Sequence, residues 1–509
     1  MKLKHLAASL ALVAAAASAQ SPGAPKNGGT LKVGLETSSL TNGFDPAVIQ
    51  GDSTGWILGQ IAEGLLNRDL KGDFVPWLAQ SWTVSKDKRV YTFKLRQGVK
   101  FHNGRVMTAG DVKFSLDRML DPKTGSRRRG ELSVIDKIEV VDANTVTVHL
   151  KESFAPFLTT LSGVWAAIIP KETLNPDGTI THLIGTGPFA LTEGSKERVT
   201  MKKFEGYWRK GEPYIDSLTF LPVPDDAARM TALRTGAVDL ITSVPNQLLP
   251  ALAPNKSRGF ELLVAPSAVW HTAIMNTTKP PFNDPRVRQA ANLAIDRNML
   301  VQALTSGFGR VDNQNWEKGS FWRLEGDPVK SNPAKAKALL AEAGFKNGPP
   351  ITIECKPEYR RDAQVIQSQL NAVGFQATIR VSDWVALNQR MKAYNFQFAI
   401  SAASGYNDPD FRFSRFYLKA GPANYLAGGY ENPKVTELLN AARVESDPLK
   451  RKESYQQVFD IIGRDVPSLM LFFEPRTLAW REELKDFNTN ADGDLSIADG
   501  GLAKTWLNR

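Results

Sequence analysis

Between residues 351 and 381 the chain reads as a strand, a helix and a second strand with almost no sequence left over. Ile351 to Cys355 is a short apolar run, Arg361 to Val373 is interpreted as a helix, and Phe375 to Val381 alternates apolar and polar side chains. Gly374 stands just past the helix, where a residue that tolerates the left-handed conformation is favoured. This order predicts a βαβ unit, which constrains the chain to a parallel strand pair covered by a helix.

Helix starts in the second half share one local signal, an Asx residue followed by proline. The Asx side-chain oxygen accepts a free backbone N–H, and proline at the first helical position lacks the N–H that would otherwise have no partner. The pairs that predict helix starts are Asp284-Pro285, Asn332-Pro333, Asn432-Pro433 and Asp447-Pro448.

Further segments extend the alternation of strands and helices over the chain. Thr108 followed by Asp111 resembles a capping box and predicts a helix through Leu120. A helix is also predicted over Trp56 to Leu66, and strands over Leu31 to Leu35, Tyr91 to Arg96, Val146 to Leu150, Phe396 to Ile400 and Leu469 to Phe473. The sequence therefore predicts an α/β protein with helices packed on mixed sheets.

Charge and cysteine content exclude several classes of site. The formal charge of +10 is spread along the chain, and the only tight basic clusters are Arg127-Arg128-Arg129 and Lys450-Arg451-Lys452. Neither cluster has interleaved aromatic residues, so both are interpreted as solvated faces and no nucleic-acid partner is expected. A single cysteine, Cys355, excludes an intrachain disulfide and any multi-cysteine metal site, and no cofactor is expected.

The N-terminus resembles an export signal. Lys2 and Lys4 precede an apolar stretch from Leu6 to Ala17, and Ala17-Ser18-Ala19 has the small-x-small pattern of a signal-peptidase site. Residues 1–19 are therefore predicted to be a cleaved signal peptide, the alternative being a buried N-terminal helix. No cysteine stands directly after the cleavage site, so no lipid anchor is expected and the periplasm is the predicted location.

One short motif suggests an enzyme. Gly51-Asp-Ser53-Thr-Gly55 matches the G-x-S-x-G pattern of serine hydrolases. That pattern needs a buried strand before the serine, and an acid and a histidine after it. Phe44-Asp45-Pro46 is loop-like instead, and the chain has only five histidines. An exported hydrolase using Ser53 is the alternative function.

Three other matches are weaker. Gly185-Thr-Gly187-Pro188-Phe-Ala190 resembles a dinucleotide fingerprint, but Pro188 removes an amide and a strand is predicted where a helix should begin. Asn488 to Asp499 resembles a calcium loop without the bidentate glutamate, and a polar surface turn is favoured. His102 is interpreted as structural. The sequence therefore predicts no reaction centre and no metal site.

Several long motifs in order resemble one family. They are Trp77 to Gly104 (WLAQSWTVSKDKRVYTFKLRQGVKFHNG), Thr108 to Val112 (TAGDV), Gly185 to Phe189 (GTGPF), Tyr207-Trp208, Asn276 to Ala290 (NTTKPPFNDPRVRQA) and Tyr406 to Pro409 (YNDP). Together they resemble the extracellular solute-binding proteins of family 5, the peptide- and nickel-type receptors of ABC importers. The resemblance covers nearly the whole chain after the signal peptide.

The resemblance implies a two-lobed periplasmic-binding-protein fold of type II, in its large form. Lobe one would comprise residues 27–266 and 474–509, with an extra subdomain at about 66–178, and lobe two residues 267–473. Two strands would cross between the lobes, near Trp270-His271 and Phe472-Phe473. It also implies a non-enzymatic monomer that captures a peptide-like or other small solute and delivers it to the permease of an ABC transporter.

Ligand contacts are expected at family-equivalent positions: Gln50, Asp52, Trp270, His271, Trp384, Tyr406 and Asp408. The aromatic residues could instead serve the hinge or the core, and Asp408 could instead cap a turn before Pro409. His271 is the only internal histidine expected in the cleft, so direct metal capture is not predicted.

The sequence departs from the peptide-binding relatives at the position that holds the α-ammonium of the peptide. The resemblance implies a tryptophan six residues before Asp408 and an acidic residue three before it, but Ala402 and Gly405 stand there. A buried ammonium without a carboxylate is costly. The ligand could therefore be a blocked peptide, another amino-containing solute or an unrelated molecule such as a glycoside, or Asp52 could supply the missing charge. A chaperone or sensor on the same scaffold stays open.

Overall fold

The computed structural model describes residues 24–41, 43–48, 51–253, 259–404, 408–490 and 493–509. The predicted signal peptide, Gln50 and Tyr406 lie outside these residues. Among the helices so described, none combines the length and the apolar composition needed to cross a bilayer.

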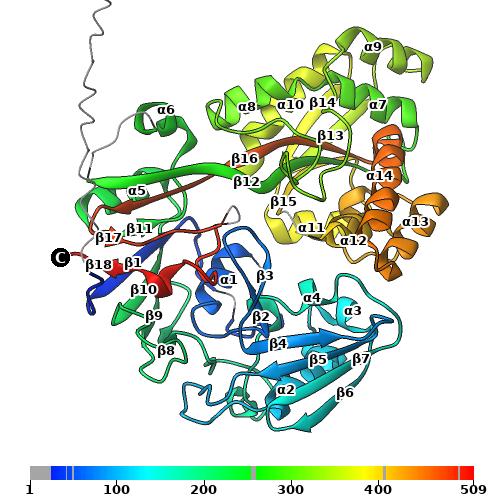
Figure 1. Cartoon of the computed structure of the whole chain (residues 1–509). Coiled ribbons are helices and arrows are strands. Elements are labelled where there is room, and N and C mark those ends of the chain that lie inside the picture. The colour runs from blue at the N-terminus through cyan, green and yellow to red at the C-terminus, as the bar shows by residue number, and fades with distance from the viewer. Residues whose placement is uncertain (1–23, 42, 49–50, 254–258, 405–407, 491–492) are drawn as a thin grey trace, which may run out of the picture.

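One mixed sheet of ten strands runs through the molecule (Figure 1). Two long neighbouring strands, β12 (Phe260–Met275) and β16 (Ser468–Arg481), lie side by side at its centre. On one side of them the order is β15 (Phe398–Ala403), β13 (Pro350–Cys355) and β14 (Gln376–Val381); on the other it is β11 (Leu240–Ile241), β1 (Thr30–Leu35), β10 (Ser217–Pro222), β9 (Val199–Lys203) and β8 (Phe189–Gly194).

We call the β8–β11 end of the sheet lobe one and the β13–β15 end lobe two. The antiparallel pairing of β12 with β16 shifts register between Pro266 and Trp270. On one side of this shift β16 pairs with β11, and on the other β12 pairs with β15. The two strands therefore cross from one lobe to the other. The lobe boundaries at 266/267 and 473/474 stay a prediction.

A separate antiparallel sheet of four strands forms what we call the subdomain, in the lower part of Figure 1. Its strands follow the order β4 (Ala79–Val84), β5 (Val90–Leu95), β7 (Thr145–Leu150) and β6 (Ile135–Asp142). Helices α2 (Ala109–Leu120), α3 (Arg129–Leu132) and α4 (Phe157–Thr160) belong to it. Two-stranded sheets pair β2 (Leu66–Arg68) with β3 (Phe74–Pro76), and β17 (Leu484–Lys485) with β18 (Trp506–Leu507).

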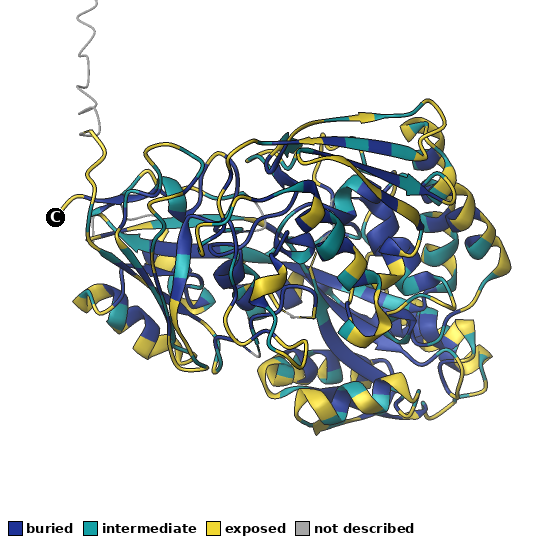
Figure 2. Cartoon of the chain, turned by 90° about the horizontal axis from the view of Figure 1, so that it is seen from below, coloured by how far each residue is buried: buried dark blue, intermediate teal, exposed yellow. Residues whose placement is uncertain are grey.

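The lobes and the subdomain have separate apolar cores. Phe189 and Phe220 belong to the lobe-one cluster, Phe93 and Phe157 to the subdomain cluster, and Phe398 to a lobe-two cluster. Figure 2 shows the buried residues along the strands and the exposed residues on the outer faces of the helices. Burial of apolar side chains in these clusters is the main force that stabilises each lobe and the subdomain.

Local signals for helix starts are confirmed. Each of the four Asx residues accepts a hydrogen bond from a backbone N–H in the first turn of its helix: α7 (Pro285–Ala294), α9 (Pro333–Glu342), α13 (Pro433–Val444) and α14 (Pro448–Asp465). The capping box of Thr108 and Asp111 opens α2 as predicted. Other helices are α5 (Asp226–Thr235), α6 (Leu249–Leu252), α8 (Arg297–Thr305) and α11 (Trp384–Lys392).

The predicted βαβ unit is present, with β13 and β14 parallel and α10 (Arg360–Ala372) between them. One predicted helix is wrong in extent, because α1 runs over Asp52–Leu58 and ends at Gly59 instead of spanning Trp56 to Leu66. Gly59 lies against Ser496, and Gly64 against the backbone of Gly163. These close approaches to distant segments turn the chain out of the helix.

Cys355 ends β13 with its side chain fully buried. Burial raises the pKa of its thiol to about 11, so the reactive thiolate is scarce at neutral pH. We expect the native protein to resist an exposed-thiol reagent for hours and to be labelled at once in denaturant. Lys346→Cys, at an exposed position of the same lobe, is the positive control. Labelling of native Cys355 as fast as that control would contradict this prediction.

Candidate functional site

A cavity of ≈ 390 Å³ lies where both lobes and the subdomain meet. Asp52 and Arg476 line it from lobe one and β16, Arg127 from the subdomain, and Ser404 and Arg415 from lobe two. This volume falls in the range of small-molecule sites.

A second cavity of ≈ 670 Å³ shares Arg127, Ser404 and Arg415 with the first. Trp384 lines it from lobe two, opposite residues 122–130 of the subdomain. Residues 401–403 connect it to a smaller cavity of ≈ 60 Å³. The two larger cavities lie between the lobes and the smallest adjoins them within lobe two; we call the three together the cleft.

The subdomain also contacts lobe two directly, away from the crossing strands. Glu131 of α3 pairs with Arg415 of α12 (Pro409–Tyr417) at 2.9 Å. The backbone N–H of Ala155 donates to the carbonyl of Arg443 at 3.0 Å, and the Arg443 guanidinium lies 5.3 Å from the ring of Phe154. Figure 1 shows α3 and α4 beneath α12 and α13. The two lobes are therefore linked both by the crossing strands and by contacts between the subdomain and lobe two.

Asp52 is the first residue of α1, and its half-exposed carboxylate lines the first cavity. Its Oδ2 lies 4.0 Å from Nη2 of Arg476. The carboxylate that was one possible partner for a ligand ammonium therefore faces a guanidinium of the protein.

The two predicted tryptophans lie on different parts of the cleft. Trp384 begins α11, is 42% exposed and faces the larger cavity. Trp270 is buried and lines the smallest cavity, 6.4 Å from Phe416 and 6.3 Å from Phe473 between ring centroids. The Arg412 guanidinium lies 5.2 Å from the Trp270 ring. Trp270 therefore packs against neighbouring aromatic rings and also lines the smallest cavity of the cleft.

His271 lines none of these cavities. Neighbouring residues of a strand point to opposite faces, so Trp270 and His271 occupy different environments. The imidazole Nδ1 is hydrogen-bonded to Asp362 of α10, and Nε2 to Glu474 of β16. Burial alone would lower the pKa of His271, but the charges of Glu474 and Asp362 outweigh it and raise that pKa to about 10.

Asp408 is held by partners within the protein. Its carboxylate accepts the backbone N–H of Asp410 at 2.9 Å at the start of α12 and pairs with Arg451 at 2.8 Å. Its alternative role as a cap before Pro409 is thus confirmed, and it lines none of the three cavities. Its signal is the same Asx-Pro pattern that marks the four predicted helix starts.

The basic cluster Arg127-Arg128-Arg129 was interpreted as a solvated face, but the structure places all three at the cleft. Nothing local distinguishes a loop that faces solvent from one that faces a neighbouring lobe. Arg476 could have been found, because Glu474-Pro475-Arg476 is a polar interruption inside the apolar strand β16.

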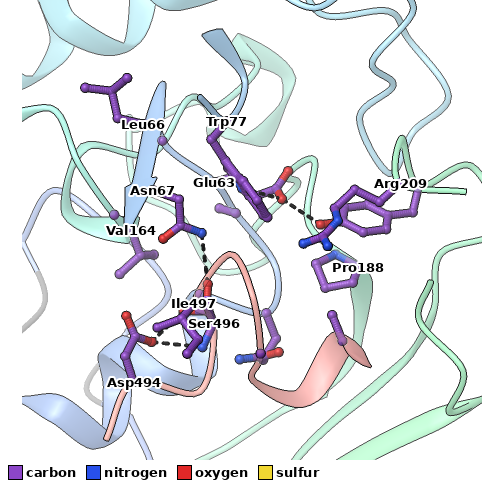
Figure 3. A pocket seen from close by; sticks show the side chains of 18 residues that line it. Glu63, Leu66, Asn67, Trp77, Val164, Pro188, Arg209, Asp494, Ser496 and Ile497 are labelled. Carbon is purple, nitrogen blue, oxygen red and sulfur yellow. Dashed lines mark hydrogen bonds between the residues drawn. The ribbon is translucent and has the colours of Figure 1, made fainter. Parts of the chain in front are cut away.

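The carboxylate of Glu63 binds residues from several of the family motifs, and Figure 3 shows it beside Trp77. Its buried carboxylate accepts hydrogen bonds from Trp77 Nε1 at 2.8 Å, Tyr207 Oη at 2.9 Å, Trp208 Nε1 at 3.0 Å and Thr186 Oγ1 at 2.7 Å. Burial raises the pKa of Glu63 to about 6 against these four donors. The cavity beside it is only ≈ 30 Å³, so this cluster fixes the joint between lobe one and the subdomain.

The weaker motifs serve packing as well. Gly185 and Gly187 lie against the backbone of residues 60–62, and β8 follows them where a dinucleotide site would need a helix. His102 contacts the Gly187 carbonyl at 3.0 Å, and burial lowers its pKa to about 4. Within the described part of the chain, no group of three or more His, Cys, Asp or Glu side chains is arranged to hold a metal ion. Part of the calcium-like match, residues 491–492, lies outside the described residues.

Three comparisons agree on the class of protein. The family model of the bacterial extracellular solute-binding proteins, family 5 Middle, matches residues 73–424. The chain is 32% identical over 453 residues to the glutathione-binding protein GsiB of Salmonella typhi, covering 86% of this chain and 87% of that protein.

Solved structures give the same answer. The periplasmic binding protein DppA of Helicobacter pylori, in complex with the peptide STSA, superposes with a TM-score of 0.85 at 25% identity, covering 95% of this chain and 99% of that one. AgaA of A. tumefaciens R10, in complex with agropinic acid, gives 0.84 at 29% identity, covering 94% and 99%. These relatives are transport receptors and give no support to a hydrolase based on Ser53, which is the second residue of α1. The chain therefore belongs to the bacterial extracellular solute-binding proteins of family 5.

Proposed function

We propose that this protein is an exported periplasmic receptor that captures a small peptide-like solute between its lobes and delivers it, as a monomer, to an ABC permease. One observation carries the proposal: a single cleft is walled by lobe one, lobe two and the subdomain together. A solute in that cleft contacts all three bodies, so it favours the closed arrangement by its greater affinity for that arrangement.

The relatives narrow the chemistry of the solute. GsiB is a glutathione-binding protein, DppA was solved with the peptide STSA, and AgaA with agropinic acid. All three ligands carry a carboxylate. We propose the same class for this chain: a peptide or amino-acid conjugate with a free carboxylate.

The proposed contacts are the residues that both the sequence and the cleft geometry favour. Asp52, Trp270 and Trp384 line the cleft. Gln50 and Tyr406 stay predictions outside the described residues. His271 and Asp408 are engaged by internal partners, and we assign them to the hinge and to the α12 cap.

Ligand capture can be tested with purified mature protein and a panel of glutathione, STSA and agropinic acid, read by intrinsic tryptophan fluorescence and thermal shift. At a concentration one hundred times its Kd, a true ligand should stabilise the folded state by about 2.7 kcal/mol. Trp384→Leu should reduce the fluorescence change on binding, and Trp480→Leu, outside the cleft lining, is the matched control.

Solution scattering with and without the ligand gives the second readout, and we expect a more compact envelope on binding. Failure of the whole panel, together with failure of neutral and cationic peptides, to shift either signal would overturn the proposed function. So would chemical turnover of a bound compound.

A further inference from the structure

The cleft has a strong excess of positive charge. The basic residues that line its two larger cavities are all arginines: Arg68, Arg127, Arg128, Arg129, Arg415 and Arg476. The acidic residues that line it are Asp52 and Asp494, and burial raises the pKa of Asp494. Counting Glu131, which pairs with Arg415, six guanidinium groups face three carboxylates. A cleft of this composition favours anionic solutes.

Arg476 lines the first cavity and not the second. Its side chain is only 11% exposed and lies over the ring of Trp56 at 5.7 Å. The buried Nε has no hydrogen-bond partner among the described residues, and Asp52 approaches only one terminal nitrogen, at 4.0 Å. A desolvated guanidinium with an unused donor matches the planar fork of a carboxylate.

Arg127 marks the boundary between the two larger cavities. Its backbone N–H donates to the carbonyl of Ala47 at 3.1 Å, which anchors the loop. Its exposed side chain lines both cavities and makes no hydrogen bond or ion pair to the part of the chain that the structure describes. Arg415 lines the same two cavities from lobe two. Guanidinium groups from the subdomain and from lobe two thus border one space.

These two positions belong to different bodies, since Arg476 lies on a crossing strand and Arg127 on the subdomain. The guanidinium of the neighbouring Arg128 lies 5.3 Å from the ring of Phe411 in α12, so the loop that carries Arg127 and Arg128 contacts lobe two. Resting on the proposed function, we infer that the cleft selects solutes with two carboxylates, one bound by Arg476 and the other by Arg127 with Arg415. A neutral or monocarboxylate analogue leaves a guanidinium unpaired, which lowers its affinity.

The test uses four dipeptides that differ only at their carboxyl groups: Gly-Glu, Gly-Gln and the C-terminal amide of each. We expect Gly-Glu to bind the wild-type protein roughly 10- to 100-fold more tightly than either probe that lacks one carboxylate. The probe lacking both should bind weakest. Isothermal titration calorimetry measures the four dissociation constants.

Protein variants then assign the two ends. Arg127→Gln and Arg476→Gln should each weaken the binding of Gly-Glu at least tenfold. One singly amidated probe lacks the carboxylate that the replaced arginine binds. Each variant should bind that probe with a dissociation constant within about twofold of the wild-type value. Arg464→Gln, exposed on α14 and outside the cleft lining, is the matched control and should bind like wild type. Arg127 is exposed, so its variant tests the inference even if Arg476→Gln misfolds.

The outcomes separate the two proposals. Equal binding of acid and amide probes, or no effect of Arg127→Gln on Gly-Glu, would overturn the two-carboxylate inference and leave the receptor function standing. Binding of none of the four dipeptides, nor of any member of the earlier panel, would overturn the proposed function itself.

Discussion

Replacing His271 with alanine is expected to lower the free energy of unfolding by about 3–5 kcal/mol, the cost of breaking a buried ion pair. The imidazole joins α10 of lobe two to the crossing strand β16 through Asp362 and Glu474. Asp362 is 5% exposed, so its carboxylate would lose its charged partner in a place with little water. Urea unfolding at pH 6 followed by circular dichroism measures the effect.

The pH dependence identifies the ion pair as the cause. The pKa of His271 is raised to about 10 in the folded state, so its contribution is complete below the unfolded value of about 6.5 and is lost as the pH rises through 10. The pKa of Glu474 is lowered by His271, against the effect of its own burial, so its contribution is lost as the pH falls below its usual range. The difference between wild type and His271→Ala should therefore be largest between about pH 4.5 and 6.5.

Two further variants control this prediction. His149→Ala removes a partly exposed histidine from the subdomain strand β7 and should change stability by less than about 0.5 kcal/mol. Asp362→Asn in the His271→Ala background should restore part of the loss, because a neutral amide costs less to bury unpaired. A difference that does not change between pH 6 and pH 10 would show that packing, and not charge, holds this position.

The second large effect is expected at Glu63. Glu63→Gln keeps the size of the side chain but replaces one carboxylate oxygen with an NH₂ group. That group cannot accept the hydrogen bonds that the carboxylate receives from donors such as Trp208 Nε1 and Thr186 Oγ1. Unsatisfied buried donors cost about 1–3 kcal/mol each, so we expect a loss of about 3 kcal/mol. Glu205→Gln, exposed in the same region, is the matched control and should be nearly neutral.

Titration of Glu63 gives a second readout. Its pKa is raised to about 6, above the unfolded value of 4.5, so the folded protein holds more protons than the unfolded chain between those values. The contribution of Glu63 to stability therefore falls as the pH rises from 4.5 to 6. Because the pKa of Asp410 is also raised to about 6 by burial, the useful curve is the wild type minus Glu63→Gln. That difference should shrink by on the order of 1–2 kcal/mol over this window, and a flat difference would refute the assignment.

Local sequence signals predicted much of the fold. The Asx-Pro helix starts, the capping box at Thr108 and the βαβ unit at 351–381 depend on hydrogen bonds and dihedral preferences within a few residues. Such interactions form in the same way wherever the segment lies in the protein. The end of α1 was missed because it depends on Ser496 and Gly163, which are far away in the sequence.

The candidate site was predicted less completely, for the same reason. Residue types and motif order in the chain were enough to indicate a two-lobed solute-binding protein. They also selected Asp52, Trp270 and Trp384, which line the cleft. The direction that each side chain faces came only from the tertiary structure. Strand alternation turns His271 away from the cleft, Asp408 is engaged by Arg451, and Arg127 and Arg415 are brought to line the same two cavities. A cleft is built from surfaces hundreds of residues apart in the chain, so its charge becomes visible only when the lobes are in place.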